Sequence, residues 1–494
     1  IKWSVKEHDI AIVESLTRLE CSAGDNISLI SPNLLKMCND LLTTLFKDRL
    51  CRNQGLLYFK TKSGWRVGDK SLERELFREL SDCDLWVGED EDVKCVSSSN
   101  ACLKNLIEFI INRAIDDPQF SKKMYDWTKG KIYFQNGYYD FLENRFIKTT
   151  DMNTFIVIPR DFSEKRDLVL RGELYRRVFD PIFTVTKKKD IQRELRDRFL
   201  HKWSRIIAGH VEDKDWMVLC GHRNCGKGVI IDLTINTFGK YIGMTNSENF
   251  AVKKNDGDSQ KALGFLFAFE WKRMMVASEM EMSKKGAGLS GTLIKKINSG
   301  GDTLCARKMY QDETEFRIQS NLVLVCNDMD EVKPVDTMEK CEMYSLNSKF
   351  VEKGESTAFH NISYYDADPT VKSEFIQDPA VLNEFVHLLI DAYNKSCAFP
   401  DEARDDANEY TDDLPGLIQR HFIVGGEAMG EAMTLGEFRL ASQSIQGYSN
   451  KKLQDTCIGL GALKPKSPFL HGGGANGAAW ISKQRGLKNI RRRH

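Results

Sequence analysis

A strand–loop–helix pattern between residues 216 and 235 constrains the fold of this chain more than any other stretch. Apolar residues from Met217 to Cys220 predict a short buried strand, and the run from Val229 to Leu233 opens a helix. Between them lies the loop Gly221-His-Arg-Asn-Cys-Gly-Lys-Gly228. Its spacing is typical of a loop that cradles phosphate groups with backbone N–H groups and a helix N-terminus. The alternative is a glycine-rich turn with a surface lysine, but the flanking strand and helix favour the phosphate loop.

The positions of this loop have distinct expected roles. Backbone N–H groups from Asn224 to Gly228 would point into the loop, and Lys227 would reach the β- and γ-phosphates of a nucleotide. Gly228 stands where Ser or Thr normally ligates magnesium, so the motif departs from its usual form there. The predicted nucleotide-binding residues are Gly221, Asn224, Cys225, Gly226, Lys227, Gly228 and Val229.

Composition limits the classes of protein to which the chain can belong. Its 494 residues allow two to four domains, and 71 basic residues balance 71 acidic ones, so any attraction to nucleic acid must come from local basic surface. The 13 cysteines form no zinc or disulfide pattern, which predicts a reducing, intracellular location. No apolar run is long enough to span a membrane. Because the chain begins at Ile1, we expect it to be part of a longer polypeptide.

Three domains are predicted along the chain. Residues 1–186 have mainly helical periodicity, and a small sheet around the turn Asn136-Gly137 follows the helices. Residues 187–355 hold the phosphate loop among alternating strands and helices, which predicts an α/β domain with a parallel sheet. Residues 356–494 read as short helices with late strands, and the last twelve residues form a basic tail without any acid.

Two further strands of the central domain end in polar residues. The buried run from Lys272 ends at Glu279, and the apolar run from Asn321 ends at Asn327. Ligands of parallel sheets bind at the carboxyl ends of strands, so Lys227, Glu279 and Asn327 are expected to share one site. The alternative for Glu279 is a solvated carboxylate at a strand end.

These residue types suit phosphoryl transfer to water, which needs neutralised phosphate charge and an aligned nucleophile. Lys227 would supply charge, Glu279 would orient or polarise the water, and Asn327 would hold the water or the γ-phosphate. Glu281 is a second choice for the acid, provided that the strand persists that far.

A predicted hairpin separates the two polar-ended strands. A helix is expected to end at Gly300-Gly301, and a β-hairpin follows from Thr303 to about Ile318. Arg307, Lys308 and Tyr310 combine cations with an aromatic ring, which suits phosphate contact and base stacking by single-stranded nucleic acid. The alternative is a solvated hairpin face.

The order of these motifs within residues 221–327, including Gly300-Gly301-Asp302, resembles the superfamily 3 helicases, an AAA+ group of viruses and plasmids. The pattern Phe134-x-Asn-Gly-x-Tyr-Asp140 resembles the accessory domain of the poxvirus-type primase-helicases of large DNA viruses. The resemblance covers about residues 100–355 well and the chain ends weakly.

The resemblance implies an AAA+ domain at 187–355, an N-terminal accessory or collar domain, and a winged-helix-like C-terminal domain. It further implies a homohexameric ring that uses ATP and Mg²⁺ and passes single-stranded or forked DNA through its centre. A primase domain or a polymerase would be a further partner, at a host-cell site of viral replication. Lys340 lies near the place of the family's arginine finger, although a lysine lacks the bidentate fork of arginine. Arg317 and Lys349 are alternatives, and magnesium would rely on phosphates, water and Glu279.

Two functions therefore compete at this point. The favoured one is an ATP-driven replicative helicase, and the second is a ring-forming DNA scaffold that binds nucleotide with little turnover. Gly228, Ser278 and Lys340 motivate the second, because each departs from the residue expected of an active ATPase. A nucleotide kinase would leave the hairpin unexplained.

Overall fold

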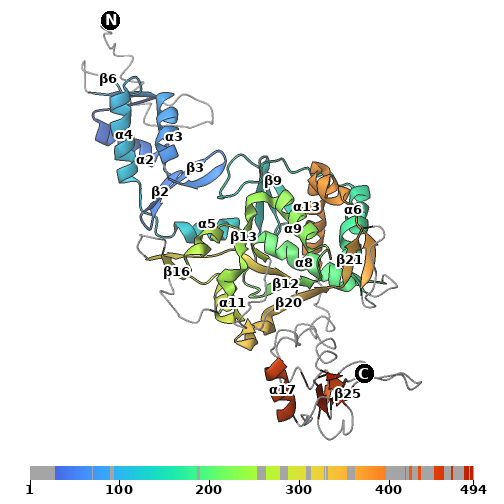
Figure 1. The fold of residues 1–494 in the computed structure, drawn as a ribbon. Coiled ribbons are helices and arrows are strands. Elements are labelled where there is room, and N and C mark those ends of the chain that lie inside the picture. The colour runs from blue at the N-terminus through green and yellow to red at the C-terminus, as the bar shows by residue number, and fades with distance from the viewer. Residues whose placement is uncertain are drawn as a thin grey trace. The chain divides into compact units, whose positions relative to one another are not determined.

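The computed structural model describes most of the chain up to residue 395 and short pieces beyond it. The described residues are 28–68, 70–88, 94–185, 190–252, 263–278, 288–307, 313–327, 329, 332–352, 362–395, 418, 422–424, 432–434, 450–460, 469–470, 483–484, 486–488 and 490–492. The chain forms two compact units, Ile1–Phe162 and Ser163–His494 (Figure 1).

The first unit combines helices with short strands. Its strands form three sheets, ordered β1–β5–β6, β2–β3–β4 and β7–β8–β9. Its elements are β1 (Ser28–Ser31), α2 (Leu34–Thr43), β2 (Leu50–Asn53), β3 (Leu56–Thr61), β4 (Gly64–Val67), α3 (Lys70–Ser81), β5 (Asp84–Val87), β6 (Lys94–Cys95), α4 (Asn100–Arg113), α5 (Phe120–Thr128), β7 (Lys131–Phe134), β8 (Gly137–Asp140) and β9 (Arg145–Lys148). The predicted turn at Asn136-Gly137 is confirmed, because it joins the antiparallel strands β7 and β8.

The expectation of a mainly helical N-terminal domain needs correction. Helices α2, α3 and α4 agree with the helical periodicity of the sequence, and their apolar faces form one buried cluster. The sequence did not reveal the strands between them, because most of these strands have only four residues. Strand β5, for example, has the exposed residues Asp84 and Trp86 around the buried Leu85, which is too short a pattern to recognise.

The second unit is built around a five-stranded sheet in which every neighbouring pair is parallel. The strand order is β13–β14–β18–β12–β20. Their bounds are β12 (Trp216–Gly221), β13 (Ile242–Asn246), β14 (Met274–Ser278), β18 (Asn321–Cys326) and β20 (Cys341–Leu346). The predicted parallel sheet is therefore confirmed, and β12, which leads into the phosphate loop, lies between β18 and β20.

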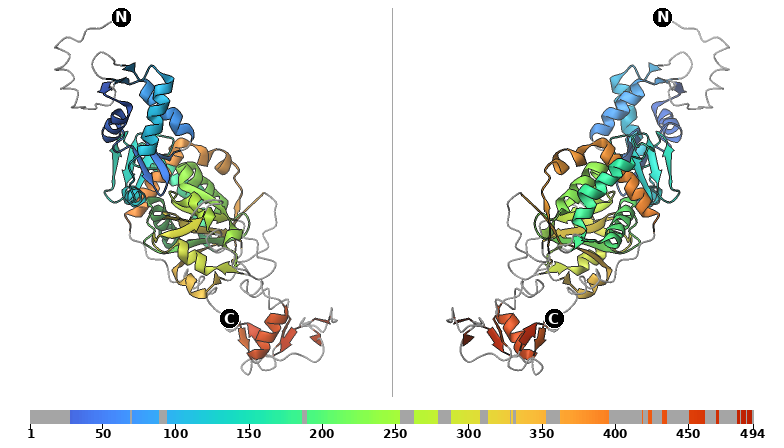
Figure 2. Two further views of the ribbon diagram at one scale, coloured as in Figure 1. Left: turned by 90° about the vertical axis from the view of Figure 1, so that its left-hand side faces the viewer. Right: turned by 90° about the vertical axis from the view of Figure 1, so that its right-hand side faces the viewer.

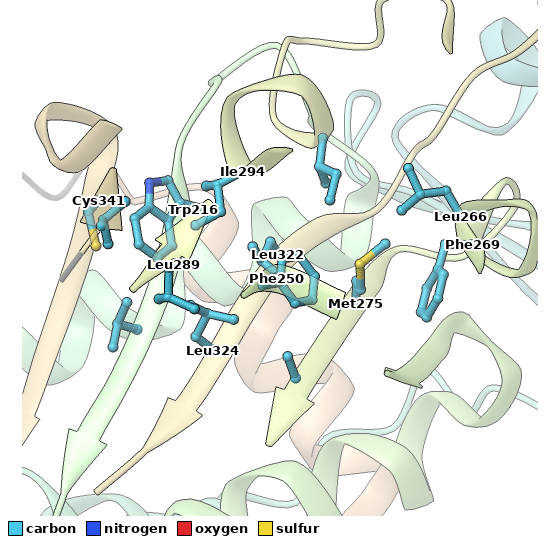
Figure 3. Close-up of a cluster of buried hydrophobic side chains, with 14 of the residues drawn as sticks. Trp216, Phe250, Leu266, Phe269, Met275, Leu289, Ile294, Leu322, Leu324 and Cys341 are labelled. Atoms are coloured by element: carbon cyan, nitrogen blue, oxygen red, sulfur yellow. The ribbon is translucent and has the colours of Figure 1, made fainter. Parts of the chain in front are cut away.

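Both faces of this sheet are buried. On one face, β12 and β18 contribute alternate residues such as Trp216 and Leu324 to a cluster that includes Ile294 of α11 (Gly291–Ile297), as Figure 3 shows. On the other face, Phe199 of α8 (Arg193–Ala208) packs edge-on against Tyr344 of β20, with ring centroids 5.4 Å apart. Burial on both sides explains why these strands read as continuous apolar runs rather than alternating ones.

Three helices cover the second face of the sheet. Helix α8 packs against α13 (Pro379–Tyr393), which also packs against α9 (Lys227–Phe238), as can be followed in Figure 2. The indole N–H of Trp203 donates to Thr234 Oγ1 at 3.0 Å and ties α8 to α9 inside the core. Helix α13 is capped at its start, where Asp378 Oδ1 accepts from the N–H of Ala380 at 2.8 Å.

The remaining elements of the second unit are short. Before and around the sheet they are α6 (Leu168–Leu174), η1 (Tyr175–Phe179), α7 (Asp180–Ile182), β10 (Thr184–Val185), β11 (Asp190–Ile191), η2 (Gly239–Tyr241), η3 (Ser247–Phe250), η4 (Gly264–Phe269), β15 (Leu289–Ser290), β16 (Leu304–Arg307), β17 (Glu313–Phe316), β19 (Val332–Lys333) and η5 (Val335–Lys340). After the sheet come β21 (Ser348–Val351), β22 (Ser363–Asp366), α12 (Thr370–Ser373), η6 (Phe375–Gln377), β23 (Phe422–Val424), β24 (Ala432–Thr434), α17 (Asn450–Gly459), β25 (Phe469–Leu470), β26 (Lys483–Gln484), β27 (Gly486–Lys488) and β28 (Ile490–Arg492).

The described pieces beyond residue 417 contain helix α17 and three antiparallel strand pairs. The basic stretch near the end of the chain contributes to all three, as β26, β27 and β28 pair with β25, β24 and β23. The winged-helix-like fold stays a prediction. In the part of the chain that the structure describes, no helix has the length and apolarity needed to cross a lipid bilayer.

Acid is expected to destabilise the second unit through three histidines, of which His210 and His387 are buried and His201 is partly buried. Burial lowers the pKa of His201, His210 and His387 below the ordinary 6.5. Below that pH the unfolded chain binds more protons than the folded one, so stability falls as the pH drops from 6.5. Urea denaturation at pH 7.5, 6.5 and 5.5 would measure this slope. His210→Gln should flatten it, because it removes one of the three groups.

Candidate nucleotide site

The loop between β12 and α9 has the backbone shape that its sequence predicts. Asn224 and Gly226 have positive φ angles of 65° and 99°, and α9 begins at Lys227. Gly226 precedes the helix as its N-cap and supplies no side-chain acceptor to the first turn. The N–H groups of that turn are therefore suited to an external anion, which the positive end of the helix also attracts.

Glycine is needed at Gly226 for reasons of both conformation and space. An added Cβ would lie 2.4 Å from Cγ1 of Ile182, in addition to the strain of φ at 99°. The Ser348 hydroxyl lies between α7 and the loop, and it is within donating distance of the carbonyl oxygens of Ile182 (3.3 Å) and Cys225 (3.2 Å). The N–H of Phe350 donates to Asn224 O at 2.8 Å. The loop is thus held from outside by α7 and β21.

Lys227 and Asn327 meet at the carboxyl edge of the sheet. The Lys227 ammonium donates to Asn327 Oδ1 at 3.2 Å, to His222 O at 3.1 Å, and to Gly221 O. It also lies 3.4 Å from the sulfur of Cys225. The backbone contacts hold the ammonium over its own loop, and the Asn327 contact joins two residues that are one hundred positions apart in sequence. This cation can neutralise a bound anion without a large rearrangement.

Glu279 and Glu281 lie outside the described residues. The structure nevertheless describes Ser278, the last residue of β14, which is paired in register with Val325 on β18. Val325 lies two residues before Asn327, so β14 ends at the same edge of the sheet as Asn327.

Lys340 lies at the other edge of the sheet. It is the exposed last residue of η5 and directly precedes β20, whose first residue pairs with Trp216 and whose last pairs with Gly221. The length of a six-residue strand, about 20 Å, therefore separates Lys340 from the loop. Within one chain the structure does not bring Lys340 to Lys227. Lys349, in contrast, is next to Phe350, which contacts the loop.

The predicted hairpin is confirmed between Leu304 and Phe316. Strands β16 and β17 pair antiparallel, and Arg307 is opposite Glu313 at the end of the described ladder. Arg307 is exposed, whereas Lys308 and Tyr310 lie outside the described residues. The described part of the hairpin leads through Gln319 and Ser320 into β18.

Magnesium ligands are sparse on the described side of the site. Gly228 is exposed and has no side-chain oxygen, and Val229 is partly buried. Among the described residues, no cluster of three or more His, Cys, Asp or Glu side chains is arranged to hold a metal ion. The residues that support the loop, Ser348, Phe350 and Ile182, had no signal in the sequence, because none belongs to a motif or to a periodic pattern with it.

Comparisons with known proteins point to viral helicases. No protein-family model matches the chain. It is 24% identical over 376 residues to "Putative helicase V13" of Sputnik virophage, covering 74% of this chain and 44% of that protein. It is also 24% identical over 173 residues to "Putative helicase L207/L206" of Acanthamoeba polyphaga mimivirus, covering 35% of this chain and 17% of that protein. The chain thus spans less than half the length of these curated relatives.

Solved structures give a more distant match. The apo structure of the NrS-1 C-terminal region aligns with 91% of this chain and 98% of that one, at 12% identity and a TM-score of 0.43. Another apo structure of this region, also in the A form, gives a TM-score of 0.39 at 11% identity. This likeness is too weak to carry an argument about function. The chain is therefore an α/β protein with a parallel sheet, similar in sequence to helicase-named proteins of two viruses.

Proposed function

We propose that this chain is the ATP-hydrolysing motor of a viral replicative DNA helicase. The observation that carries the proposal is the contact of Lys227 with Asn327 at the carboxyl edge of a parallel sheet, beside a loop shaped for phosphate. Similarity to viral proteins with helicase names supports the same class of function.

Each residue has a chemical task in this proposal. Lys227 neutralises the β- and γ-phosphates, and the N–H groups at the start of α9 bind their oxygens. Glu279 orients the attacking water, and Asn327 holds that water or the γ-phosphate. Asn327 suits this task because its amide lies next to the Lys227 ammonium while retaining N–H donors for an oxygen of the ligand.

A magnesium ion would bind through phosphate oxygens, water and Glu279, since Gly228 offers no hydroxyl. When bound, it would supply further charge neutralisation at the phosphates. The protein would then bind the phosphates mainly through the backbone N–H groups of the loop and through Lys227.

We assign the motor to the AAA+ class and, within it, to superfamily 3, on the motif order around the sheet. A homohexameric ring with ATP sites between subunits would give Lys340 a role, because its distance from its own loop suits contact with a neighbour's site. Arg307, Lys308 and Tyr310 would grip single-stranded DNA in the ring, with a primase domain or a polymerase as a further partner at the viral replication site.

The second candidate is a ring-forming DNA scaffold that binds ATP with little turnover. The absence of a hydroxyl at Gly228 and the serine at position 278 favour it, because both weaken the expected binding of magnesium. DNA binding would then depend on nucleotide occupancy rather than on hydrolysis.

Strand separation distinguishes the two candidates. A forked DNA duplex with one labelled strand would be incubated with the protein and either ATP or a non-hydrolysable ATP analogue. We expect ATP-dependent release of the labelled strand by the wild type and a loss of at least about tenfold in Glu279→Gln, whose amide cannot act as a base. Equal release with the analogue, or by Glu279→Gln, would favour the scaffold instead.

A further inference from the structure

A second lysine lies over the first turn of the helix that follows the phosphate loop. Gly228 and Asp232 are four residues apart on α9 and so share one face of the helix. The Lys372 ammonium, from α12, is 2.8 Å from Asp232 Oδ2. An added Cβ at Gly228 would lie 3.3 Å from the same nitrogen. The ammonium therefore lies against the space that a Ser or Thr side chain at position 228 would enter.

The backbone that carries Lys372 is held firmly in place. Arg177 donates to Asp368 Oδ2 at 2.7 Å and to Thr370 Oγ1 at 2.6 Å, just before Lys372. Beyond it, Asn236 Nδ2 of α9 donates to Ile376 O at 3.0 Å. The start of α12 is thereby held to η1 and η6 is held to α9, so Lys372 lies between two fixed points of the backbone.

The side chain of Lys372 is free to exchange partners. Its side chain is 55% exposed and that of Asp232 is 45% exposed, and an ion pair in such a setting contributes little to stability. Moving the ammonium from Asp232 to a nearby phosphate therefore costs little.

The positive charges around Gly228 favour the binding of an anion. Lys227, Lys372 and the positive end of α9 gather there, whereas a cation near a helix N-terminus is normally unfavourable. A bound polyphosphate would place negative charge between the two ammonium groups and the helix N-terminus, so that both lysines would then be stabilised by attraction.

We propose that Lys372 is a phosphate-binding residue of the same nucleotide site. On binding of a nucleoside triphosphate, its ammonium leaves Asp232 and contacts phosphate oxygens next to Gly228. It supplies positive charge where a hydroxyl at position 228 would otherwise have recruited magnesium. Nucleotide binding by this chain should consequently depend less on Mg²⁺ than it would with Ser or Thr there. The inference rests on the proposed ATP binding.

The test is a calorimetric titration of the protein with ATP, which measures the dissociation constant once in excess Mg²⁺ and once in EDTA. In EDTA, Lys372→Ala should weaken ATP binding at least about tenfold, the loss of one charge-assisted hydrogen bond. Lys372→Arg should stay near the wild type. Asp232→Asn, which releases the ammonium, should bind ATP as tightly as the wild type or more tightly. The matched control is Lys395→Ala, at an exposed lysine that follows α13.

The signs of these effects separate the possible roles. If the ion pair only fastens α12 to α9, Lys372→Ala and Asp232→Asn will weaken binding equally, and the inference is overturned. Wild-type binding that Lys372→Ala leaves unchanged in EDTA also overturns it, while the proposed function stands. A wild type that binds no ATP in either buffer removes the proposed function and this inference together.

Discussion

Lys227→Met is expected to lower DNA-stimulated ATP hydrolysis by about two to three orders of magnitude, the usual effect of removing one preorganised charge-stabilising donor. The ammonium now bonds to Gly221 O, His222 O and Asn327 Oδ1, so it is already placed at the mouth of the loop. Methionine keeps the length of the side chain and removes its charge. Phosphate release from ATP, with and without single-stranded DNA, is the measurement.

Two controls make this result specific. Lys395→Ala should hydrolyse ATP at the wild-type rate, since it removes a lysine remote from the loop in sequence. Thermal unfolding of Lys227→Met in the absence of nucleotide should stay close to the wild type, because the ammonium is only partly buried. An unchanged rate of hydrolysis in a folded Lys227→Met protein would contradict the assignment of the site.

Lys202→Met is expected to destabilise the second unit by about 3–5 kcal/mol, the typical cost of breaking a buried ion pair from one side. The side chain of Lys202 is 1% exposed and lies between Asp215 and Asp213, with Asp213 Oδ2 at 3.2 Å. Burial already raises the pKa of Asp215, so loss of the lysine leaves that carboxyl without compensation. Asp213 keeps Arg205, at 2.7 Å. Urea denaturation at pH 7.5 measures the change.

A surface pair of the same type serves as the control. Lys295 and Asp336 form an ion pair with side chains 45% and 57% exposed, so Lys295→Met should change stability by less than about 1 kcal/mol. The double variant Lys202→Met with Asp215→Asn should recover part of the loss, because it removes the charge left behind. A cost for Lys202→Met as small as that for Lys295→Met would show that the buried lysine contributes no net stability.

The sequence predicted the centre of the second unit well because its signals there are local. The apolar run before Gly221 and the helix after Lys227 are contiguous patterns, and the structure has β12 and α9 at those positions. The meeting of Lys227 with Asn327 followed from one general rule, that parallel strands present their carboxyl ends at a common edge. It needed no knowledge of the strand order.

The sequence could not predict residues whose role depends on tertiary packing. Ser348 and Phe350 support the loop from a later strand, and Lys372 reaches α9 from a short helix after it, with no repeat or motif to connect them. For Lys340, the structure gives the position in the sheet and leaves the predicted role open. The sequence suggested Lys340 as a finger residue, and the direction of β20 places it at the end of the sheet away from its own loop, so its role at a neighbouring subunit's site stays a prediction.

Strand β18 has a mechanical consequence for how the two ends of the sheet are linked. Its six residues are fully buried between β14 and β12, with Asn327 directly after one end. At the other end, Ser320 Oγ donates to Phe269 O at 3.0 Å, and the chain continues from there into β17 of the hairpin. A strand that is hydrogen-bonded to a neighbour on each side cannot shorten along its axis, so its two ends move together. In the proposed motor, any shift of Asn327 that accompanies loss of the γ-phosphate would be transmitted to the base of the hairpin over about 20 Å.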